Sequence, residues 1–411
     1  MRVALLSMLD IAEGGQGLRA ELPVGGRSIA RHQLGLALSL DCKRIVFLAE
    51  KLEAELVSLQ HVAEDAGAQF HVIAAPRGLV PLVSPADELF VLSDGLLAMP
   101  DVARELLDQA PGVLVLPVEA GLPAGFERLD INHSNAGAMR LPGRLVARLG
   151  ELPGDWSATS ALLRIAVQAG VPLRTLPVAL LDEERWALVG SEAEAGAIEA
   201  TWMRLLTSTG GALTPGKRVA NLLVRLGGPA ILHAGTRPWV IYLAAALTGV
   251  FGLGAAWFGY PAIGFALMGA AWLGGEGAQL LRRIDRASLA EPVGRAGVEA
   301  GFGWLVDLAF VFACVWRSEL AGAETLPRGT EAFAPLVLFG LLRLVSRVLP
   351  RSVWAQWLGD RLLAAVLLVL ASVFFPFDVA LALMCLIILA AALAATYLLP
   401  DSPNPVLTKD R

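Results

Sequence analysis

The chain has 411 residues, of which 55% are hydrophobic and only 17% are charged, and its mean hydropathy is +0.61. This composition is too apolar for an ordinary soluble protein. The formal net charge of -5 supplies no basic surface of the kind that nucleic acids require, so we exclude a nucleic-acid partner.

The charged residues divide the sequence into two parts. Residues 1–235 carry charge at the density of a soluble protein, whereas long uncharged runs alternate with arginine-bearing loops from Trp239 onward. We predict four regions: a cytoplasmic α/β domain over 1–210, an interfacial helix and linker over 211–238, an embedded all-α domain over 239–399 and a cytoplasmic tail over 400–411.

Short apolar runs alternate with helical stretches in the first region. "RVALLSML" at the N-terminus is interrupted by Asp10 and Glu13 before any cleavage site, so we interpret it as a strand and not as a signal peptide. Further strands are predicted at 42–49, 69–75 and 88–95, with a glycine-rich loop running into a helix over 13–40 and a helical stretch over 51–67 between them. This alternation predicts an α/β fold with a mostly parallel sheet.

Two features of this region are typical of phosphate sites. The glycine-rich loop over 13–19 follows the first strand and precedes a helix, where backbone amides can approach phosphate oxygens. Asp94 stands at the end of the apolar strand over 88–95, at the sheet edge where α/β proteins bind ligands, and is a candidate ligand for magnesium. A plain strand-to-helix turn and an Asp-Gly turn are the alternative interpretations.

Six apolar segments follow residue 238, each near the roughly 20 residues that a helix needs to cross a bilayer. They cover 239–258, 261–281, 299–316, 331–349, 362–377 and 379–399. Arginines gather after the second and fourth segments, which places these loops, the first domain and the tail on the cytoplasmic side. We therefore predict a six-helix transmembrane bundle, in a bacterial-type inner membrane, with both termini in the cytoplasm.

An amphipathic segment precedes the first apolar run. Val219, Leu222, Leu223 and Leu226 recur at helical spacing, and basic residues lie near them. A helix lying on the anionic membrane surface and a solvated linker helix both fit this pattern.

The first domain resembles sugar-phosphate nucleotidyltransferases, which implies a GT-A or Rossmann-like fold. "GGQGLRAELPVGGRSI" is similar to the family's G-x-G-[TS]-R loop and its later P-V-x-G-[KR]-P segment, and "ERWALVG" is similar to its W-x-D-[VI] segment. The resemblance implies nucleotide binding by Gly15, Gly17, Arg19, Gly25 and Gly26, and metal binding by Asp94. Leu188 stands where the family has its second metal-binding aspartate.

The embedded half resembles the CDP-alcohol phosphatidyltransferases, and the order of the two domains is that of bifunctional inositol-phosphate cytidylyltransferases and phospholipid synthases. "AWLGGEGAQLLRR" lies where that family has its first two aspartates, with Leu273 at the first position and Glu276 at the second. The resemblance implies phosphate binding by Arg282 and Arg283. It also implies Mg²⁺, CTP or a CDP-alcohol and the lipid bilayer as ligands and partners, and we expect a homodimer.

Three acidic residues of the embedded half are candidate metal ligands. Glu276, Glu299 and Asp307 could face a common cavity and hold one ion, because acids inside spans are costly and are functional candidates. The alternative is that each is satisfied separately by arginine, water or a neighbouring helix. The sequence leaves three functions open: a head-group enzyme with an altered site, a pseudoenzyme that acts as a partner or lipid-binding subunit, and a small transporter.

Overall fold

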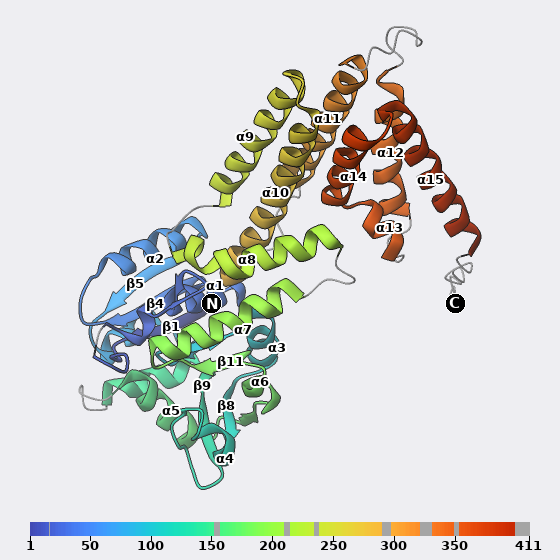
Figure 1. The fold of residues 1–411 in the computed structure, drawn as a ribbon. Coiled ribbons are helices and arrows are strands. Elements are labelled where there is room, and N and C mark those ends of the chain that lie inside the picture. The colour runs from blue at the N-terminus through green and yellow to red at the C-terminus, as the bar shows by residue number, and fades with distance from the viewer. Residues whose placement is uncertain are drawn as a thin grey trace, which may run out of the picture. The chain divides into compact units, whose positions relative to one another are not determined.

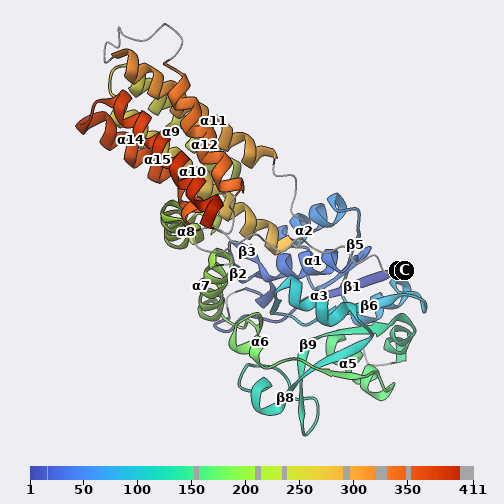
Figure 2. The same ribbon diagram turned by 90° about the vertical axis from the view of Figure 1, so that its right-hand side faces the viewer.

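The computed structural model describes residues 1–15, 17–151, 157–208, 214–233, 238–289, 297–320, 331–348 and 353–398 (Figures 1 and 2). The predicted tail over 400–411 lies outside these residues. The chain divides into two compact units. The α/β unit is Met1–Thr209 with Arg225–Thr236 and Leu281–Gly294, and the helical unit is Gly210–Val224, Arg237–Leu280 and Arg295–Arg411.

A seven-stranded sheet forms the centre of the α/β unit, in the order β10-β8-β9-β6-β1-β4-β5. Strand β9 is antiparallel to both neighbours, and the other pairs are parallel. The predicted α/β fold with a mostly parallel sheet is thereby confirmed. The strands are β1 Arg2–Met8, β4 Arg44–Ala49, β5 Gln69–Ile73, β6 Glu88–Leu92, β8 Gly112–Pro117, β9 His133–Pro142 and β10 Leu173–Thr175.

Helices and two small sheets surround this sheet. The small sheets pair β2 Pro23–Val24 with β3 Arg27–Ser28 and β7 Leu96–Ala98 with β11 Trp186–Leu188. The α-helices are α1 Ile29–Ser39, α2 Ala54–Asp65, α3 Pro100–Asp108, α4 Val118–Gly121, α5 Ala158–Gln168, α6 Ala179–Asp182 and α7 Glu192–Ser208. The 3-10 helices are η1 Arg19–Glu21, η2 Pro76–Leu82 and η3 Gly143–Glu151.

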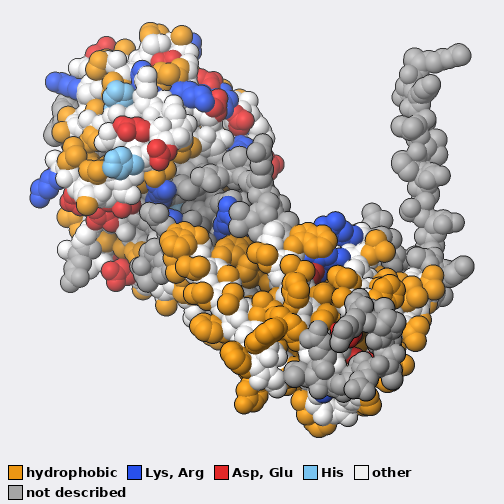
Figure 3. All heavy atoms as spheres, turned by 90° about the horizontal axis from the view of Figure 1, so that it is seen from above, with side chains coloured by type: hydrophobic (Ala, Val, Ile, Leu, Met, Phe, Trp, Pro, Cys, Tyr) orange, Lys and Arg blue, Asp and Glu red, His pale blue; other side chains and the backbone are white. Residues whose placement is uncertain are grey.

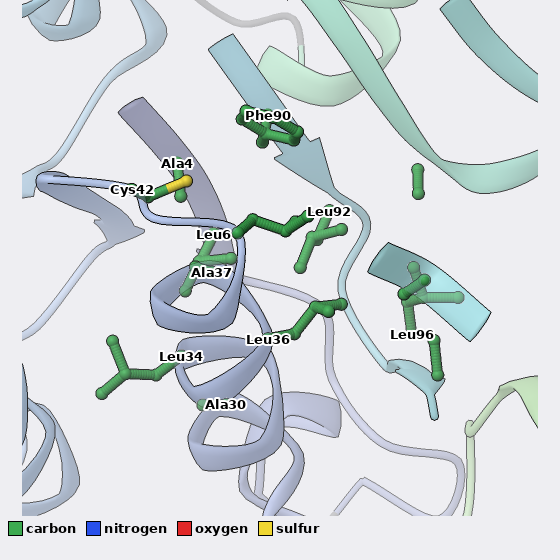
Figure 4. Close-up of a cluster of buried hydrophobic side chains, with 14 of the residues drawn as sticks. Ala4, Leu6, Ala30, Leu34, Leu36, Ala37, Cys42, Phe90, Leu92 and Leu96 are labelled. Atoms are coloured by element: carbon green, nitrogen blue, oxygen red, sulfur yellow. The ribbon is translucent and has the colours of Figure 1, made fainter. Parts of the chain in front are cut away.

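Both faces of the large sheet are buried. Along β1, Ala4 and Leu6 belong to one hydrophobic cluster, whereas Val3 and Leu5 belong to a second one. Figure 4 shows side chains of α1, β1 and β6 pointing toward one another in the first cluster. Two covered faces explain why the strand sequences are continuous apolar runs and do not alternate with polar residues. Ser28 is the N-cap residue of α1. Its side chain accepts a hydrogen bond from the Arg31 amide, which fixes the helix start.

The helical unit is built mainly from α9 to α15. Its helices, with α8 before them, are α8 Pro215–His233, α9 Pro238–Trp257, α10 Pro261–Leu289, α11 Gly297–Leu320, α12 Phe333–Val348, α13 Val353–Leu358, α14 Arg361–Phe374 and α15 Phe377–Leu398. The six apolar segments of the sequence fall on α9, α10, α11, α12, α14 and α15, and α13 is an additional short helix.

Three of these helices are long and apolar enough to cross a membrane, in the stretches Trp239–Trp257, Gly301–Ser318 and Phe377–Ala394. The prediction of six such spans is therefore met only in part. Helix α14 is apolar, but its 14 residues extend about 21 Å against the roughly 30 Å of a hydrocarbon core. Helix α12 has 16 residues and includes Arg343 and Arg347, and α10 includes Glu276, Arg282 and Arg283.

The surface of the helical unit is strongly apolar. Trp239, Phe251, Leu305, Phe374 and Ile387 are among its exposed large side chains, each more than half exposed. Figure 3 shows hydrophobic side chains covering much of the visible face of the helices, while charged side chains of both signs gather over the α/β unit. An apolar surface of this extent is typical of contact with lipid or with a protein partner.

Close helix crossings in the helical unit depend on glycine. A Cβ atom added at Gly264 of α10 would lie 2.8 Å from the Gly252 carbonyl oxygen of α9 and 3.0 Å from the Ala256 Cβ. Such short approaches are typical of membrane helix interfaces, where small residues allow backbones to pack directly. The crossing of α9 and α10 is therefore fixed by backbone contact.

We expect Gly264→Ala to lower the free energy of unfolding by about 1–3 kcal/mol, because the new methyl group would displace the backbone of α9. Gly254→Ala is the matched control, since nothing lies within 4 Å of a Cβ there. That change should be neutral or stabilising by up to about 1 kcal/mol through helix propensity. Thermal unfolding in detergent measures both, and equal effects would contradict the close crossing.

Candidate nucleotide site

The candidate site lies where the direction of the sheet connections reverses. From β1 the chain proceeds to β4 and β5 on one side, whereas β6 lies on the other side and leads to the remaining strands. Ligands of open α/β sheets bind outside the carboxyl ends of strands at such a switch point. Here β1 ends at Met8 and β6 ends at Leu92, and the glycine-rich loop and Asp94 follow these ends.

Asp94 is 5% exposed and links the two strand ends. Its Oδ2 accepts hydrogen bonds from the Leu9 amide at 2.7 Å, the Asp10 amide at 2.8 Å and the Ser7 hydroxyl at 3.4 Å. Its Oδ1 is buried and has no hydrogen-bond partner among the described residues. One oxygen of Asp94 therefore anchors the loop, and metal binding through the other oxygen stays a prediction.

Burial raises the pKa of Asp94 from 3.8 to about 6, since desolvation disfavours the charged carboxylate. The amides of Asp10 and Leu9 act in the opposite direction, and the negative charge of Asp10 adds to the increase. A carboxyl group with this pKa is ionised at neutral pH and can be protonated under mildly acidic conditions.

Gly95 allows a close approach beside Asp94. Its φ is +74°, and a Cβ atom there would lie 2.5 Å from the Val189 carbonyl oxygen. The Val189 amide donates to the Gly95 carbonyl at 2.8 Å, so β11 and its continuation are held against this turn. The segment "ERWALVG" thus lies beside Asp94 and Gly95, with Trp186 buried and its Nε1 donating to the Ala136 carbonyl at 2.8 Å.

Arg19 lies over the same turn. Its Cδ is 3.5 Å from the Cβ position of Gly95, and its Nη2 is 3.6 Å from the Cβ position of Gly190. Its Nε is buried without a hydrogen-bond partner in the described part of the chain. The guanidinium group therefore extends between Gly95 and Gly190, close to Glu13, whose Oε1 is 3.2 Å from the same Gly190 position.

The predicted glycines lie in two separate turns. Gly15 and Gly17 have φ values of +75° and +82° in the loop after β1, and nothing lies within 4 Å of a Cβ at Gly15. Gly25 and Gly26, at +62° and +72°, form the two-residue turn between β2 and β3. A tight hairpin requires positive φ at both central residues, and this requirement by itself explains why both positions are glycine. Nucleotide binding by all four glycines stays a prediction.

The candidate metal ligands of the embedded half are not brought into one cluster. Among the described residues, no three His, Cys, Asp or Glu side chains come together as a metal site. Glu276 lies on α10 beside three glycines, of which Gly275 packs against Phe302 and Gly277 against Val224. Glu299 belongs to α11, and its side chain lies outside the described residues. Arg282 is half-buried and Arg283 is exposed near the end of α10.

Asp307 is held by Arg343 and Arg361. In the sequence, the arginines of this region served only to predict membrane orientation. Its Oδ1 accepts from Arg361 Nε at 2.8 Å, and its Oδ2 accepts from Arg361 Nη2 at 2.9 Å and from Arg343 Nε at 2.5 Å. The Arg343 guanidinium also stacks on the Trp304 ring at 3.7 Å. Both oxygens of Asp307 thus have cationic partners, which corresponds to the alternative of an acid satisfied by neighbouring helices. An arginine inside an apolar run was the signal that could have revealed this.

Replacing Asp307 should destabilise the helical unit whether or not magnesium is present. Asp307→Asn leaves the buried guanidinium of Arg361 and the partly buried one of Arg343 without their counter-ion, and removing one partner of a buried pair typically costs about 3–5 kcal/mol. Glu331→Gln removes an acid that forms no ion pair with a described residue and serves as control. Thermal unfolding with Mg²⁺ and with chelator checks this; a loss seen only with Mg²⁺ would instead favour a metal ligand.

The raised pKa of Asp94 predicts a pH-dependent stability. The unfolded carboxyl group loses its proton near pH 4, whereas the folded one keeps it to about pH 6, so the free energy of unfolding falls as pH rises between these values. The shift corresponds to about 3 kcal/mol. Asp94→Asn should remove this decline, while Asp65→Asn, at an exposed position, should keep it. Unfolding of the purified chain between pH 4 and 7 measures the difference, and parallel profiles for all three proteins would contradict it.

Comparison with known proteins finds fold neighbours for part of the chain. No family model matches the sequence, and no curated protein matches it. One similar structure is a UDP-glucose pyrophosphorylase complexed with UDP-glucose, with 10% identity and a TM-score of 0.36; the match covers 50% of this chain and 99% of that one. Another is the inositol-1-phosphate CTP transferase from T. maritima, with 13% identity and a TM-score of 0.37, covering 49% of this chain and 96% of that one.

Proposed function

We propose that the α/β unit binds a nucleotide, either CTP or a CDP-alcohol, and that the chain acts in phospholipid head-group synthesis at a membrane. One observation carries the proposal: the glycine-rich loop, Arg19 and the free oxygen of Asp94 meet at the switch point between β1 and β6. The neighbours' ligands are properties of those proteins, so the proposal depends on this chain's own geometry.

The loop and Arg19 supply the groups that a phosphate requires. Gly14, Gly15 and Gly17 of the loop have positive φ and carry no side chain, so nothing on these three residues blocks an approach to their backbone. Arg19 has an unpartnered Nε among the described atoms and a fixed position over Gly95. A planar guanidinium group binds phosphate oxygens through two parallel hydrogen bonds, which gives both affinity and orientation.

Magnesium fits this site as an ion shared with the nucleotide. Carboxylate oxygen is a preferred ligand type, and Oδ1 of Asp94 is a buried carboxylate oxygen without a hydrogen-bond partner in the described chain. Mg²⁺ is commonly held by one or two carboxylates, with phosphates and water completing its coordination. Asp94 would hold the ion, which would neutralise phosphate charge.

The same geometry favours binding over fast nucleotidyl transfer. Leu188 stands where the resembling family has its second metal-binding aspartate, and Oδ2 of Asp94 is already used by Leu9 and Asp10. Losing one charge-stabilising group typically lowers the rate by a factor of about 10²–10³. A pseudoenzyme that binds nucleotide as the subunit of an active relative is therefore the second candidate, and Asp307 with its two arginine partners favours it.

The membrane assignment is supported by three apolar helices and by the exposed surface around them. Helix α8 adds a basic amphipathic segment, in which Leu222, Leu223 and Leu226 are 55%, 54% and 74% exposed. On its other side Ala220 and Val224 are buried. A helix with an exposed apolar row beside basic residues suits the membrane surface. We place both termini in the cytoplasm, at a bacterial-type inner membrane, and expect six spans and a homodimer.

Binding of CTP with Mg²⁺ should stabilise the purified full-length chain. At 100 times the dissociation constant the gain is about 2.7 kcal/mol, because the ligand binds the folded state alone. Thermal unfolding is followed with CTP and, separately, with a CDP-alcohol lipid. If neither ligand shifts the transition, the proposal is wrong. Binding without release of pyrophosphate in the presence of phosphorylated alcohols would favour the pseudoenzyme.

Arg19→Gln should abolish most of this stabilisation. Arg104→Gln, at an exposed position of α3, removes the same charge elsewhere on the unit and should leave it unchanged. Asp94→Asn should reduce the contribution of Mg²⁺ while keeping metal-free nucleotide binding. Equal losses for Arg19→Gln and Arg104→Gln would indicate general charge attraction instead of the proposed site.

A further inference from the structure

A cavity of about 380 Å³ opens in the helical unit, and none of the acidic residues considered above lines it. The turn over 259–263, between α9 and α10, forms one wall, and Arg317 of α11 and Ser372 of α14 form the other. Three separate helix ends thus build one hollow. Its volume lies within the roughly 300–1,000 Å³ range typical of small-ligand sites.

Arg317 supplies an uncompensated cation to this cavity. Its Nη2 donates to the Ser372 carbonyl at 3.3 Å, and its guanidinium lies 5.8 Å from the centre of the Phe377 ring. Asp378 is close along the chain but accepts a hydrogen bond from the Ser318 hydroxyl at 2.6 Å. Arg317 forms no ion pair with any carboxylate in the described ranges. A guanidinium group has five N–H donors, so most of its donor capacity remains for a ligand.

The backbone on the opposite wall of the cavity also favours a negatively charged ligand. Helix α10 begins at Pro261, and Gly264 donates to the Tyr260 carbonyl at 3.0 Å. The amides of Ala262 and Ile263 belong to the first helical turn, where intrahelical acceptors are missing and the helix dipole is positive. These amides support Arg317, which remains the principal group for an anion.

Aromatic residues locate the cavity at the end of the apolar helices. Trp257 and Ser318 are the last residues of two candidate membrane spans, and Trp257 packs edge-on against Trp316 with ring centres 5.0 Å apart. Phe258 and Tyr260 are 78% and 62% exposed beside the cavity. Tryptophan and tyrosine gather at the boundary between hydrocarbon and head groups. The cavity therefore lies at the level where lipid phosphates occur.

We propose that this cavity binds the phosphate head group of an anionic phospholipid, with Arg317 contacting the phosphate and the acyl chains lying along the exposed apolar surfaces of α9 and α10. Exposed Ile263 at the cavity wall and Phe251 on α9 continue that apolar surface. A lipid suits this site better than free phosphate, because only a lipid uses the cation and the apolar surface together. The inference rests on the proposed membrane embedding and not on nucleotide binding.

Native mass spectrometry of the full-length chain in detergent tests the proposal. Phosphatidic acid and phosphatidylglycerol should bind saturably, phosphatidylcholine should bind at least tenfold more weakly, and inorganic phosphate should not compete at millimolar concentration. Arg317→Gln should lower the affinity for phosphatidic acid at least tenfold, and Arg317→Lys should lower it less. Arg347→Gln, which removes an exposed arginine of α12, should leave the affinity unchanged.

Filling the cavity gives a second and independent variant. Ala262→Trp should lower lipid affinity without changing charge, and a cooperative thermal unfolding transition close to that of the unmodified chain shows that both cavity variants fold. The proposal is overturned if Arg317→Gln binds lipid like the unmodified chain, if Arg347→Gln loses as much affinity, or if inorganic phosphate displaces the lipid. Loss of the CTP response alone would count against the nucleotide proposal and not against this one.

Discussion

The hydrogen bonds to Asp94 are the interaction on which the candidate site depends. One carboxylate oxygen receives the amides of Leu9 and Asp10, so the loop after β1 must start against the end of β6. The Asp10 backbone carbonyl then accepts a hydrogen bond from the Arg19 amide at 2.8 Å, which closes the loop and fixes where the arginine side chain begins. The position of the Arg19 cation is thus set by a buried anion, Asp94, through two successive hydrogen bonds. Charge-assisted hydrogen bonds of this kind are strong enough to order a loop that glycine leaves flexible.

The same arrangement limits what the site can do. An oxygen that accepts three hydrogen bonds from its own chain has little capacity left for a metal, so Asp94 offers one free oxygen instead of two. Desolvation also disfavours the charged form of Asp94, because a buried carboxylate must be stabilised either by a cation or by a proton. Nucleotide phosphates with Mg²⁺ would supply that cation when bound. The free-energy gain from neutralising Asp94 would then contribute to ligand affinity, which suits a binding domain even where transfer is slow.

The sequence predicted the parts of the fold that depend on local pattern. Strands β1, β4, β5 and β6 are uninterrupted apolar runs, and Asp94 follows one of them, so both the sheet and the edge that carries the site could be expected. Strand β9 was missed because His133, Asn135 and Arg140 make it look like a loop, although it is buried between β6 and β8. Contacts between distant residues were out of reach: Arg343 and Arg361 are 36 and 54 positions from Asp307. Helical periodicity does not determine which helices meet.

The charges of the helical unit show why these distant contacts matter. Asp307 is 4% exposed and Arg361 is 6% exposed, so neither would be tolerated alone in an apolar bundle, and each makes the other possible. With Arg343 the group carries one net positive charge, and the Arg343 guanidinium lies over the exposed ring of Trp304. Arg317 differs from these arginines, since it has no carboxylate partner among the described residues and borders a cavity. Paired ions hold α11, α12 and α14 together, whereas Arg317 is the cation that we propose recognises a ligand.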